Sequence, residues 1–372
     1  MGPREKLRRI RDELGHVFLE RAELIDGALA ALLTGHHLLI IGPPGTAKSM
    51  LADELCRRLE GAVYFQWLLT KFTTPEEIFG AVSLKALEHD EYRRVTTAKL
   101  PEAHIAFLDE VFKASSSILN ALLTVMNERR FHNGREVVDV PLVTLFGATN
   151  ELPEDDELQA LYDRFLLRYV VAYIGEDFRF LKMLQASPPE SRTTLNLAGW
   201  KRAQTEVRAV AVPDAIYRVL ADLRRELGRR QLVSSDRRYR QAIDVLRACA
   251  YLHERDHVTE DDLFFLEHVL WRDPSELAEV RATIHRLLRG YVEEARALLY
   301  QTRELQEYAH RQWESNELRS RAVVEAHTKI RNILNRVTAI LDEARRAGRP
   351  TGPVDEVRAE IETIQQRMLE AL

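Results

Sequence analysis

The spacing of apolar residues divides the first two thirds of the chain into regions of different periodicity. Up to about residue 36, apolar side chains recur every three or four positions, which predicts helices. Short and almost wholly apolar runs then alternate with helix-like segments, at residues 37–41, 62–68, 105–108, 142–148 and 166–174. Because strands that alternate with helices imply a parallel sheet covered on both faces, this region is predicted to be an α/β domain with αβα layers.

Two segments do not fit a plain αβα arrangement. Residues 80–101, between the second and third predicted strands, form a charged insertion. Residues 128–141 contain Asn133-Gly134 between alternating apolar and polar positions. Asn-Gly in such a setting is the strongest short-range signal for a β-hairpin. The sequence therefore predicts a small hairpin just before the fourth strand of the sheet.

The rest of the chain reads as helical. From about residue 206 onward no strand pattern occurs, and residues 212–227, 236–251 and 261–271 predict a small all-α domain of three or four short helices. Thr259 and Asp262 resemble a capping box. Beyond Pro274, apolar residues repeat at spacings of four and three in residues 284–305, 323–341 and 357–368, which is typical of heptad seams on long helices. We interpret these as a three-helix antiparallel bundle; one very long helix is the alternative.

Composition narrows the class of protein. The 372 residues are 45% hydrophobic and 30% charged, with a net charge of −5 that gives no global attraction to nucleic acid or to an anionic membrane. Cys56 and Cys249 lie in helix-like surroundings, where reduced packing residues are expected rather than a disulfide. The N-terminus reads as a charged amphipathic helix and not as a signal peptide. No apolar run approaches the roughly 20 residues that span a bilayer. These features predict a soluble, cytoplasmic protein.

A Gly-rich loop after the first predicted strand carries the clearest chemistry. It reads Gly-Pro-Pro-Gly-Thr-Ala-Lys-Ser and opens a helix-like segment. Its backbone N–H groups and the positive end of the helix dipole converge on one place, where a polyphosphate fits. Lys48 can reach the outer phosphates and the Ser49 hydroxyl can ligate Mg²⁺. Ala47 stands where the strict P-loop pattern has glycine, and a tight turn before an ordinary helix is the alternative. The predicted ATP-binding residues are Gly42, Pro43, Pro44, Gly45, Thr46, Ala47, Lys48, Ser49, Met50 and Asp109.

The third predicted strand ends in two adjacent acids, Asp109 and Glu110. In P-loop NTPases the acid at this position holds Mg²⁺ and a following glutamate polarises the attacking water. Ser49 and Asp109 are therefore the predicted metal ligands, and Glu110 is the predicted catalytic base. The two motifs, in this order and each on its own apolar strand, predict a Mg²⁺-dependent ATPase that converts ATP to ADP and phosphate.

Three further polar residues have a predicted catalytic role, each with an alternative. Asn150 follows the fourth strand and can hydrogen-bond the γ-phosphate or the attacking water, unless it only forms a turn. Arg164 precedes the fifth strand and can act as an arginine finger on a neighbouring subunit, unless it pairs with Asp163 or Glu157 of its own chain. Arg237 opens a helix of the all-α region and can contact phosphates, unless it belongs to a solvated basic turn.

Together these residues resemble the MoxR branch of the AAA+ ATPases, and most closely the RavA type. The resemblance covers roughly residues 10–272 and is carried by Gly42–Ser49, Asp109-Glu110 and residues 70–80, 100–103, 127–134, 150–153, 160–165 and 235–238. It implies a nucleotide-binding core (residues 1–205) with an insertion in helix 2 and a hairpin before sensor 1, a helical lid (206–275) and a C-terminal helical bundle (276–372).

The resemblance also implies roles and partners. It makes Asn150 sensor 1, Arg164 the arginine finger and Arg237 sensor 2, with the adjacent Arg238 able to exchange with Arg237. It implies a homo-oligomer, a hexamer, that works with a partner carrying a von Willebrand factor A (vWA) domain. RavA-type proteins carry a β-rich domain within the C-terminal bundle, and residues 276–372 show none, so the lysine decarboxylase partner of RavA is not carried over.

The sequence thus predicts an oligomeric ATP-hydrolysing motor that remodels or activates a protein partner in a chaperone-like way. One alternative is a nucleotide-gated scaffold with slow hydrolysis, in which the long C-terminal helices recruit partners. Another is a nucleic-acid-dependent motor, against which the mixed charge of residues 128–141 argues.

Overall fold

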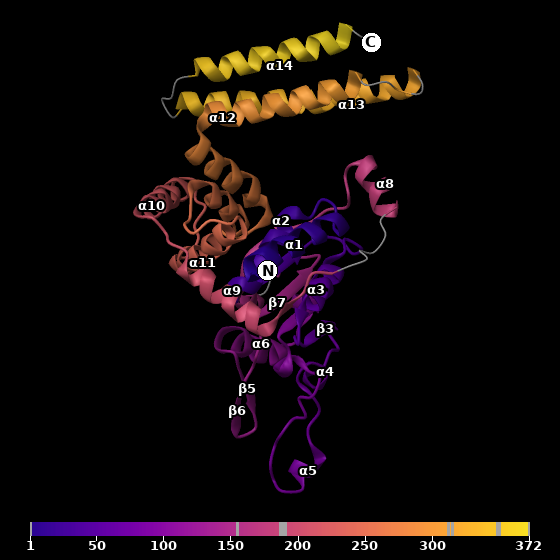
Figure 1. Ribbon diagram of the computed structural model, residues 1–372, viewed down its shortest axis with the longest axis vertical. Coiled ribbons are helices and arrows are strands. Elements are labelled where there is room, and N and C mark those ends of the chain that lie inside the picture. Colours follow the sequence, from indigo (N-terminus) through magenta and orange to yellow (C-terminus); the bar gives the residue numbers. More distant parts are fainter. Residues whose placement is uncertain are drawn as a thin grey trace. The chain divides into compact units, whose positions relative to one another are not determined.

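The computed structural model describes residues 2–153, 156–185, 192–310, 313, 316–346 and 351–370. The chain forms two units, Met1–Leu277 and Ala278–Leu372. The first unit begins with α1 (Pro3–Val17) and α2 (Ala22–Thr34), as the helical periodicity of this region predicts. Their apolar faces are buried, and α2 packs against both α1 and β1, so these helices close one side of the core (Figure 1).

A five-stranded parallel sheet lies at the centre of the first unit. Its strand order is β3-β4-β7-β1-β8, and all its pairings are parallel. The strands are β1 (His37–Ile41), β3 (Tyr64–Leu68), β4 (Ile105–Asp109), β7 (Thr144–Thr149) and β8 (Phe165–Val170). Strands β1 and β7 are buried along their whole length, as continuous apolar runs require in a sheet covered on both faces. The predicted α/β fold with a parallel sheet is confirmed.

The register of this sheet determines where the polar strand ends lie. Ile41 pairs with Thr149 of β7 and with Val170 of β8, and Asp109 pairs with Leu68. Because the strands are parallel, the segments that follow β1, β4 and β7 leave the same edge of the sheet. The segment before Phe165 lies at the opposite edge, since Phe165 pairs with His37 at the start of β1.

The remaining elements of the core are short or helical. Helix α3 (Lys48–Arg57) follows β1, α6 (Ser116–Glu128) follows β4, and α7 (Asp156–Tyr162) precedes β8. Further segments are α4 (Pro75–Phe79), α5 (Leu84–Leu87), α8 (Asp177–Gln185) and the 3-10 turns η1 (Leu100–Glu102) and η2 (Val111–Lys113). A two-stranded pair, β2 (Leu59–Glu60) with β9 (Leu195–Asn196), was not predicted. Two-residue strands carry too little pattern to be recognised.

The predicted hairpin is present and touches the charged insertion. It consists of β5 (Arg130–Asn133) and β6 (Glu136–Asp139), and Gly134 in its turn has a φ of 68°. The Asn133 side chain is buried and pairs with the backbone of Arg94 in the insertion. Its Oδ1 accepts from the Arg94 N–H at 2.6 Å, and its amide donates to the Arg94 carbonyl at 3.1 Å. Hairpin and insertion extend from the same side of this unit (Figure 1).

Helices follow the sheet, as predicted. They are α9 (Leu197–Ala209), α10 (Asp214–Arg229), α11 (Asp236–Leu252) and the 3-10 helix η3 (Glu260–His268), with a further 3-10 turn, η4 (Pro274–Glu276). The predicted capping box of Thr259 and Asp262 opens η3. Helix α11 packs against α2 and α9, which anchors this part on the core. Cys56 and Cys249 are free and buried, and burial raises the pKa of the Cys56 thiol to about 11.

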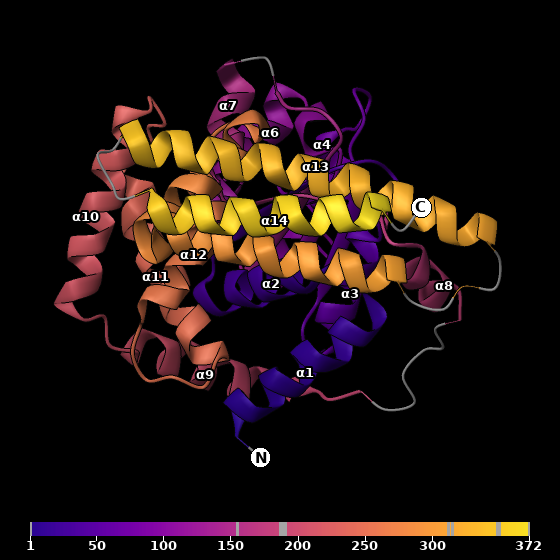
Figure 2. The ribbon, with the colours of Figure 1, turned by 90° about the horizontal axis from the view of Figure 1, so that it is seen from above.

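The second unit is a bundle of three helices, α12 (Leu277–His310), α13 (Asn316–Arg346) and α14 (Gly352–Glu370) (Figure 2). One buried apolar cluster takes residues from all three helices, as the heptads predict. Arg286 of α12 pairs with Glu343 near the end of α13, over 2.6 Å, so these neighbours run antiparallel. Arg303 pairs with Glu360 of α14, also over 2.6 Å.

One detail of the heptad prediction is wrong. The first seam was expected to run unbroken from residue 284 to 305, but Gly290 has a φ of 73° and a ψ of 166°, which interrupts α12. The cluster that fills the bundle begins at Tyr291, and the buried Ile284 is not part of it. Glycine tolerates this conformation without a steric penalty, and a heptad count does not register it. The sequence also predicts a break at residues 348–353 before the last helix; residues 347–350 lie outside the described residues, and α14 begins at Gly352. Among the described helices, none is long and apolar enough to cross a membrane.

Candidate nucleotide-binding site

The loop between β1 and α3 has the backbone of an anion-binding turn. The Gly42 N–H donates to the Thr149 carbonyl at 3.0 Å, which fastens the start of the loop to β7. A Cβ on Gly42 would lie 2.2 Å from the Val171 carbonyl oxygen, so only glycine fits there. Gly45 has a φ of 78°. No side chain caps the N-terminus of α3 at Ala47, so the first N–H groups of the helix remain available to an anion.

Ala47 adopts the left-handed conformation, with a φ of 62° and a ψ of 25°. This is the position where the sequence departs from the strict P-loop, and the backbone explains why glycine is usual there. Alanine reaches the left-handed region at a cost of about 1 kcal/mol. The substitution is therefore compatible with the loop, but it stores a small strain.

The Lys48 ammonium lies at the centre of the loop. Nζ donates to the Gly42 carbonyl, to the Pro43 carbonyl at 3.2 Å and to Oδ1 of Asn150 at 3.3 Å. Burial lowers the pKa of Lys48, and the negative charges of Asp109 and Glu110 partly oppose this effect. The cation thus contacts the loop carbonyls and Asn150, and it is close enough to the acids at the end of β4 for their charges to affect its pKa; that it binds outer phosphates remains a prediction.

Glu110 is held by side chains from two directions. It has a left-handed backbone, with a φ of 52°, and its N–H donates to Oδ1 of Asp109 at 3.1 Å. One carboxylate oxygen accepts from Nδ2 of Asn150 at 2.9 Å, and the other lies 3.3 Å from Nζ of Lys113. Lys113 was not predicted from the sequence, although its position three residues after Glu110 is a spacing at which side chains commonly meet.

The donor set at this edge suits Mg²⁺ and a polyphosphate. Ser49 and Asp109 are both partly accessible and supply a hydroxyl and a carboxylate, which are the oxygen ligands that Mg²⁺ prefers. Thr46, by contrast, donates its hydroxyl to the Pro43 carbonyl at 2.9 Å and so braces the loop. Met50 is exposed in the first turn of α3. The predicted loop, β4 and β7 residues therefore meet at one place.

The predicted arginines are not at this place. Arg237 donates to the Asp163 carboxylate and, at 3.2 Å, to the Asp163 carbonyl, which lies just before β8. The pKa of Arg164 is lowered by burial and by the positive charge of Arg237. The strand from Phe165 to Val170 separates this group from the edge that carries Lys48, by roughly 16 Å at 3.3 Å per residue. Arg164 and Arg237 thus lie together at the opposite edge of the sheet.

Arg237 and Arg238 are not equivalent. Arg238 is buried, and its guanidinium donates to the carbonyls of Val269 at 2.9 Å, Phe165 at 3.2 Å and Leu166 at 2.6 Å. It connects α11 and the end of η3 to β8. Arg237 is exposed and faces solvent next to Asp163. Of the two, only Arg237 is accessible to a ligand.

Comparison with known protein families agrees with this geometry. Residues 5–209 match the family model described as the MoxR domain in the MoxR-vWA-beta-propeller ternary systems. The chain belongs to the MoxR family. In addition, residues 215–284 match an AAA lid domain.

Relatives of this MoxR-family chain include archaeal and bacterial proteins. Two proteins of Methanocaldococcus jannaschii without an assigned function are each 41% identical, one over 78% of this chain and 76% of its own length, the other over 79% of each. Chaperone MoxR1 of Mycobacterium tuberculosis is 27% identical over 68% of this chain and 70% of its own length.

A solved structure shares the fold. It is that of a protein from Cytophaga hutchinsonii, proposed to be an ATPase, which superposes with a TM-score of 0.61 at 20% identity and covers 77% of this chain and 94% of its own. The MoxR and AAA+ assignments made from the sequence are confirmed. None of these matches names the RavA type.

Proposed function

We propose that this MoxR-family protein is a Mg²⁺-dependent ATPase that works as a ring of identical subunits and remodels or activates a protein partner. The observation that carries the proposal is the chain of contacts from Lys48 through Asn150 to Glu110. Asn150 lies within hydrogen-bonding reach of both Lys48 and Glu110, which supports roles for Lys48 as the phosphate-binding cation, Asn150 as the polar sensor and Glu110 as the carboxylate base. Family membership adds the expectation of ATP hydrolysis.

Each residue at this edge of the sheet is proposed to have its own chemical role. The loop N–H groups and Lys48 bind the phosphates, while Ser49 and Asp109 would hold Mg²⁺, whose charge would neutralise the outer phosphates. Glu110 orients a water molecule and accepts its proton. Asn150 hydrogen-bonds both Lys48 and Glu110, so it is placed to respond when a γ-phosphate enters between them.

The arginines support a shared active site. Arg164 and Arg237 lie at the edge of the sheet opposite to Lys48, so neither is placed to act on the ATP of its own subunit. In a ring, that edge can face the nucleotide of the next subunit. We propose that both arginines act in trans, Arg164 as the finger and Arg237 as sensor 2, and that the ring is a hexamer.

The partner we propose is a protein with a vWA domain. The description of the matching family model names MoxR-vWA-beta-propeller ternary systems. This description supports a vWA-domain partner rather than the lysine decarboxylase that is the partner of RavA. That this chain is most similar to the RavA type within the MoxR family remains a prediction. The hairpin and the insertion, held together by Asn133, are proposed to transmit the nucleotide cycle to the client.

The experiment that tests the proposal mixes two inactive variants. Arg164→Ala is expected to bind ATP and hydrolyse it roughly 10³-fold more slowly, since an arginine finger contributes at least that much. Lys48→Ala loses ATP affinity but keeps its arginines. In mixed rings, the intact nucleotide site of the first variant meets the intact finger of the second, so activity rises above the sum of the two.

Mass measurement establishes that the rings contain both variants. No gain in such rings contradicts the shared site. A different result would indicate a nucleotide-gated scaffold instead. In that case nucleotide causes the rings to assemble, but the wild type hydrolyses ATP slowly and a vWA-domain partner does not stimulate it.

A further inference from the structure

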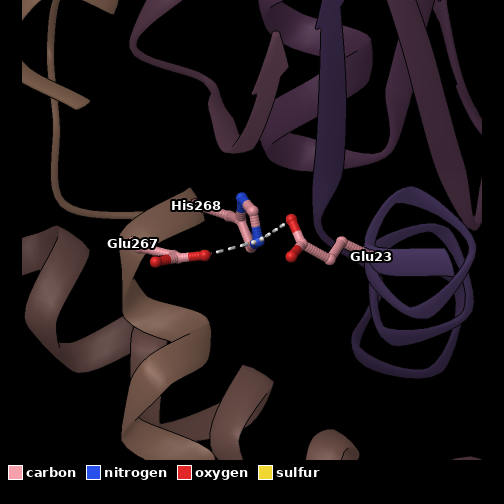
Figure 3. A group of neighbouring side chains, drawn as sticks. All are labelled: Glu23, Glu267 and His268. Carbon is pink, nitrogen blue, oxygen red and sulfur yellow. Dashed lines mark ion pairs between the residues drawn. The ribbon is translucent and has the colours of Figure 1, made fainter. Parts of the chain in front are cut away.

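Three side chains from distant parts of the sequence form a compact group in the first unit. They are Glu23 in the first turn of α2, and Glu267 and His268 at the end of η3 (Figure 3). One ligand atom from each lies within 4.8 Å of the other two. Nε2 of His268 is 3.5 Å from a Glu23 oxygen and 3.6 Å from a Glu267 oxygen, and it lies between the two carboxylates.

Both separations are those of ion pairs, and they also fit a metal centre. An N–H···O hydrogen bond is about 2.7–3.2 Å long, so both distances exceed it. Nitrogen and oxygen ligands at about 2.0–2.1 Å from a tetrahedral Zn²⁺ lie about 3.4 Å from one another. The two distances from Nε2 are close to the edges of such a tetrahedron. A histidine nitrogen with two carboxylates suits zinc-class cations rather than Mg²⁺ or Ca²⁺.

The surroundings hold the imidazole in this position. Its ring stacks on Tyr169 of β8, with centroids 4.2 Å apart and an interplanar angle of 23°. The Phe265 ring meets it at 5.5 Å and 75°. His268 and Glu267 are both buried, whereas the Glu23 side chain is 67% exposed. Packing therefore fixes the imidazole, Glu267 is buried beside it, and Glu23 lies on the exposed side of the group.

We propose that Glu23, Glu267 and His268 bind one zinc-class divalent cation, with water completing a tetrahedron. Its two positive charges balance the two carboxylates, one of which is buried, while the imidazole coordinates as a neutral base. Glu23 lies in the part that matches the MoxR domain, and the other two ligands lie in the part that matches the lid. The cation thus connects lid and core within one subunit. The proposal does not depend on ATP hydrolysis.

The test uses the full chain, stripped with a chelator, and two metals. Co²⁺ reports geometry, because a tetrahedral site gives intense ligand-field absorption; Zn²⁺ is followed by the midpoint of thermal unfolding, Tm. Excess Mg²⁺ is kept in all samples to occupy oxygen-rich sites. The wild type is expected to bind one Co²⁺ per chain with a tetrahedral spectrum, and Zn²⁺ is expected to raise its Tm.

The informative variant is Glu23→Gln, because Glu23 is exposed and its replacement leaves the core intact. It is expected to weaken Co²⁺ binding by about tenfold or more and to abolish the rise in Tm. Glu23→His, which restores a ligand, is expected to recover binding. Glu254→Gln, at an exposed acid that pairs with Arg8, is the matched control and is expected to behave as the wild type. Absence of a tetrahedral Co²⁺ spectrum in the wild type overturns the proposal, and so does equal binding by Glu23→Gln and the control.

Discussion

The side-chain amide of Asn150 donates a 2.9 Å hydrogen bond to the carboxylate of Glu110, which joins the end of β7 to the end of β4. The carbonyl oxygen of the same amide accepts from Lys48 at 3.3 Å. One asparagine thus contacts both the cation proposed to bind phosphate and the proposed base. A γ-phosphate that drew Lys48 toward itself would change the partners of Asn150, and Glu110 would then be affected through the same amide.

Glu110→Gln is expected to bind ATP with nearly unchanged affinity and to hydrolyse it about 10²–10⁴-fold more slowly, because the amide keeps the shape of the side chain but not its basicity. Lys48 and Asp109 remain in place to hold the nucleotide. Affinity is measured by calorimetry and hydrolysis by phosphate release. Lys113→Ala is the companion variant: it removes the partly exposed ion pair with Glu110, and at about 1 kcal/mol or less it should change the rate no more than about fivefold. Wild-type turnover by Glu110→Gln would remove Glu110 from the mechanism.

Ala47→Gly is expected to stabilise the protein, by about 0.5–1 kcal/mol in the free energy of unfolding. The φ of 62° at Ala47 strains any side chain with a Cβ, and glycine relieves that strain. The matched control is Ala221→Gly in the exposed face of α10, where a helical backbone should make glycine destabilising by about 1 kcal/mol. Urea unfolding of both variants provides the comparison. Destabilisation of equal size at the two positions would show that Ala47 does not need the left-handed conformation.

Alanine substitutions at the two adjacent arginines of α11 are expected to have different effects, one on stability and the other on ATP hydrolysis. Arg238→Ala should destabilise the protein by about 3–5 kcal/mol, since it removes a buried guanidinium that donates to three carbonyls, of which that of Phe165 also accepts from Arg168. Arg237→Ala should lose only an exposed ion pair, worth about 1 kcal/mol at most, yet hydrolyse ATP poorly in assembled rings.

Unfolding in urea and steady-state hydrolysis are measured on both variants, with the exposed Arg240→Ala as the control. A stable Arg238→Ala together with a fully active Arg237→Ala would reverse the two assignments.

The sequence predicted those parts of the site that lie just after the ends of strands. Apolar runs located β1, β4 and β7, and the parallel connection of strands brings their carboxyl ends to one edge, so Lys48, Asp109 and Asn150 could be grouped without coordinates. Arg237 could not be placed in this way. Its position depends on how α11 packs against β8, and a helix contact between segments some 70 residues apart leaves no periodic signal in either segment.

Other features could not be predicted from sequence patterns, and the reasons are physical. Gly290 interrupts α12 through its backbone dihedral angles, which a heptad count cannot detect. Glu23 and His268 are far apart in sequence and belong to no spaced motif, so only the packing of both α2 and η3 on β8 and α11 brings them together. The bond between Asn133 and Arg94 likewise joins two segments that were each predicted separately, as a hairpin and as an insertion.

That last contact gives a direct test of whether the hairpin and the insertion act as one body. In Asn133→Ala both hydrogen bonds to the Arg94 backbone are lost, and at about 0.5–1.5 kcal/mol each they should be worth about 1–3 kcal/mol of local stability. The amide of Arg94 is therefore expected to exchange its hydrogen for deuterium at least about fivefold faster than in the wild type, while amides of the parallel sheet keep their protection. His132→Ala, at the exposed neighbouring position of β5, is the matched control and should leave the exchange of Arg94 unchanged.

Because hairpin and insertion are proposed to carry the nucleotide cycle to the client, Asn133→Ala should also retain basal ATP hydrolysis and lose stimulation by a vWA-domain partner. Exchange at Arg94 that is the same in both variants would mean that the two segments move independently, and that Asn133 does not couple them.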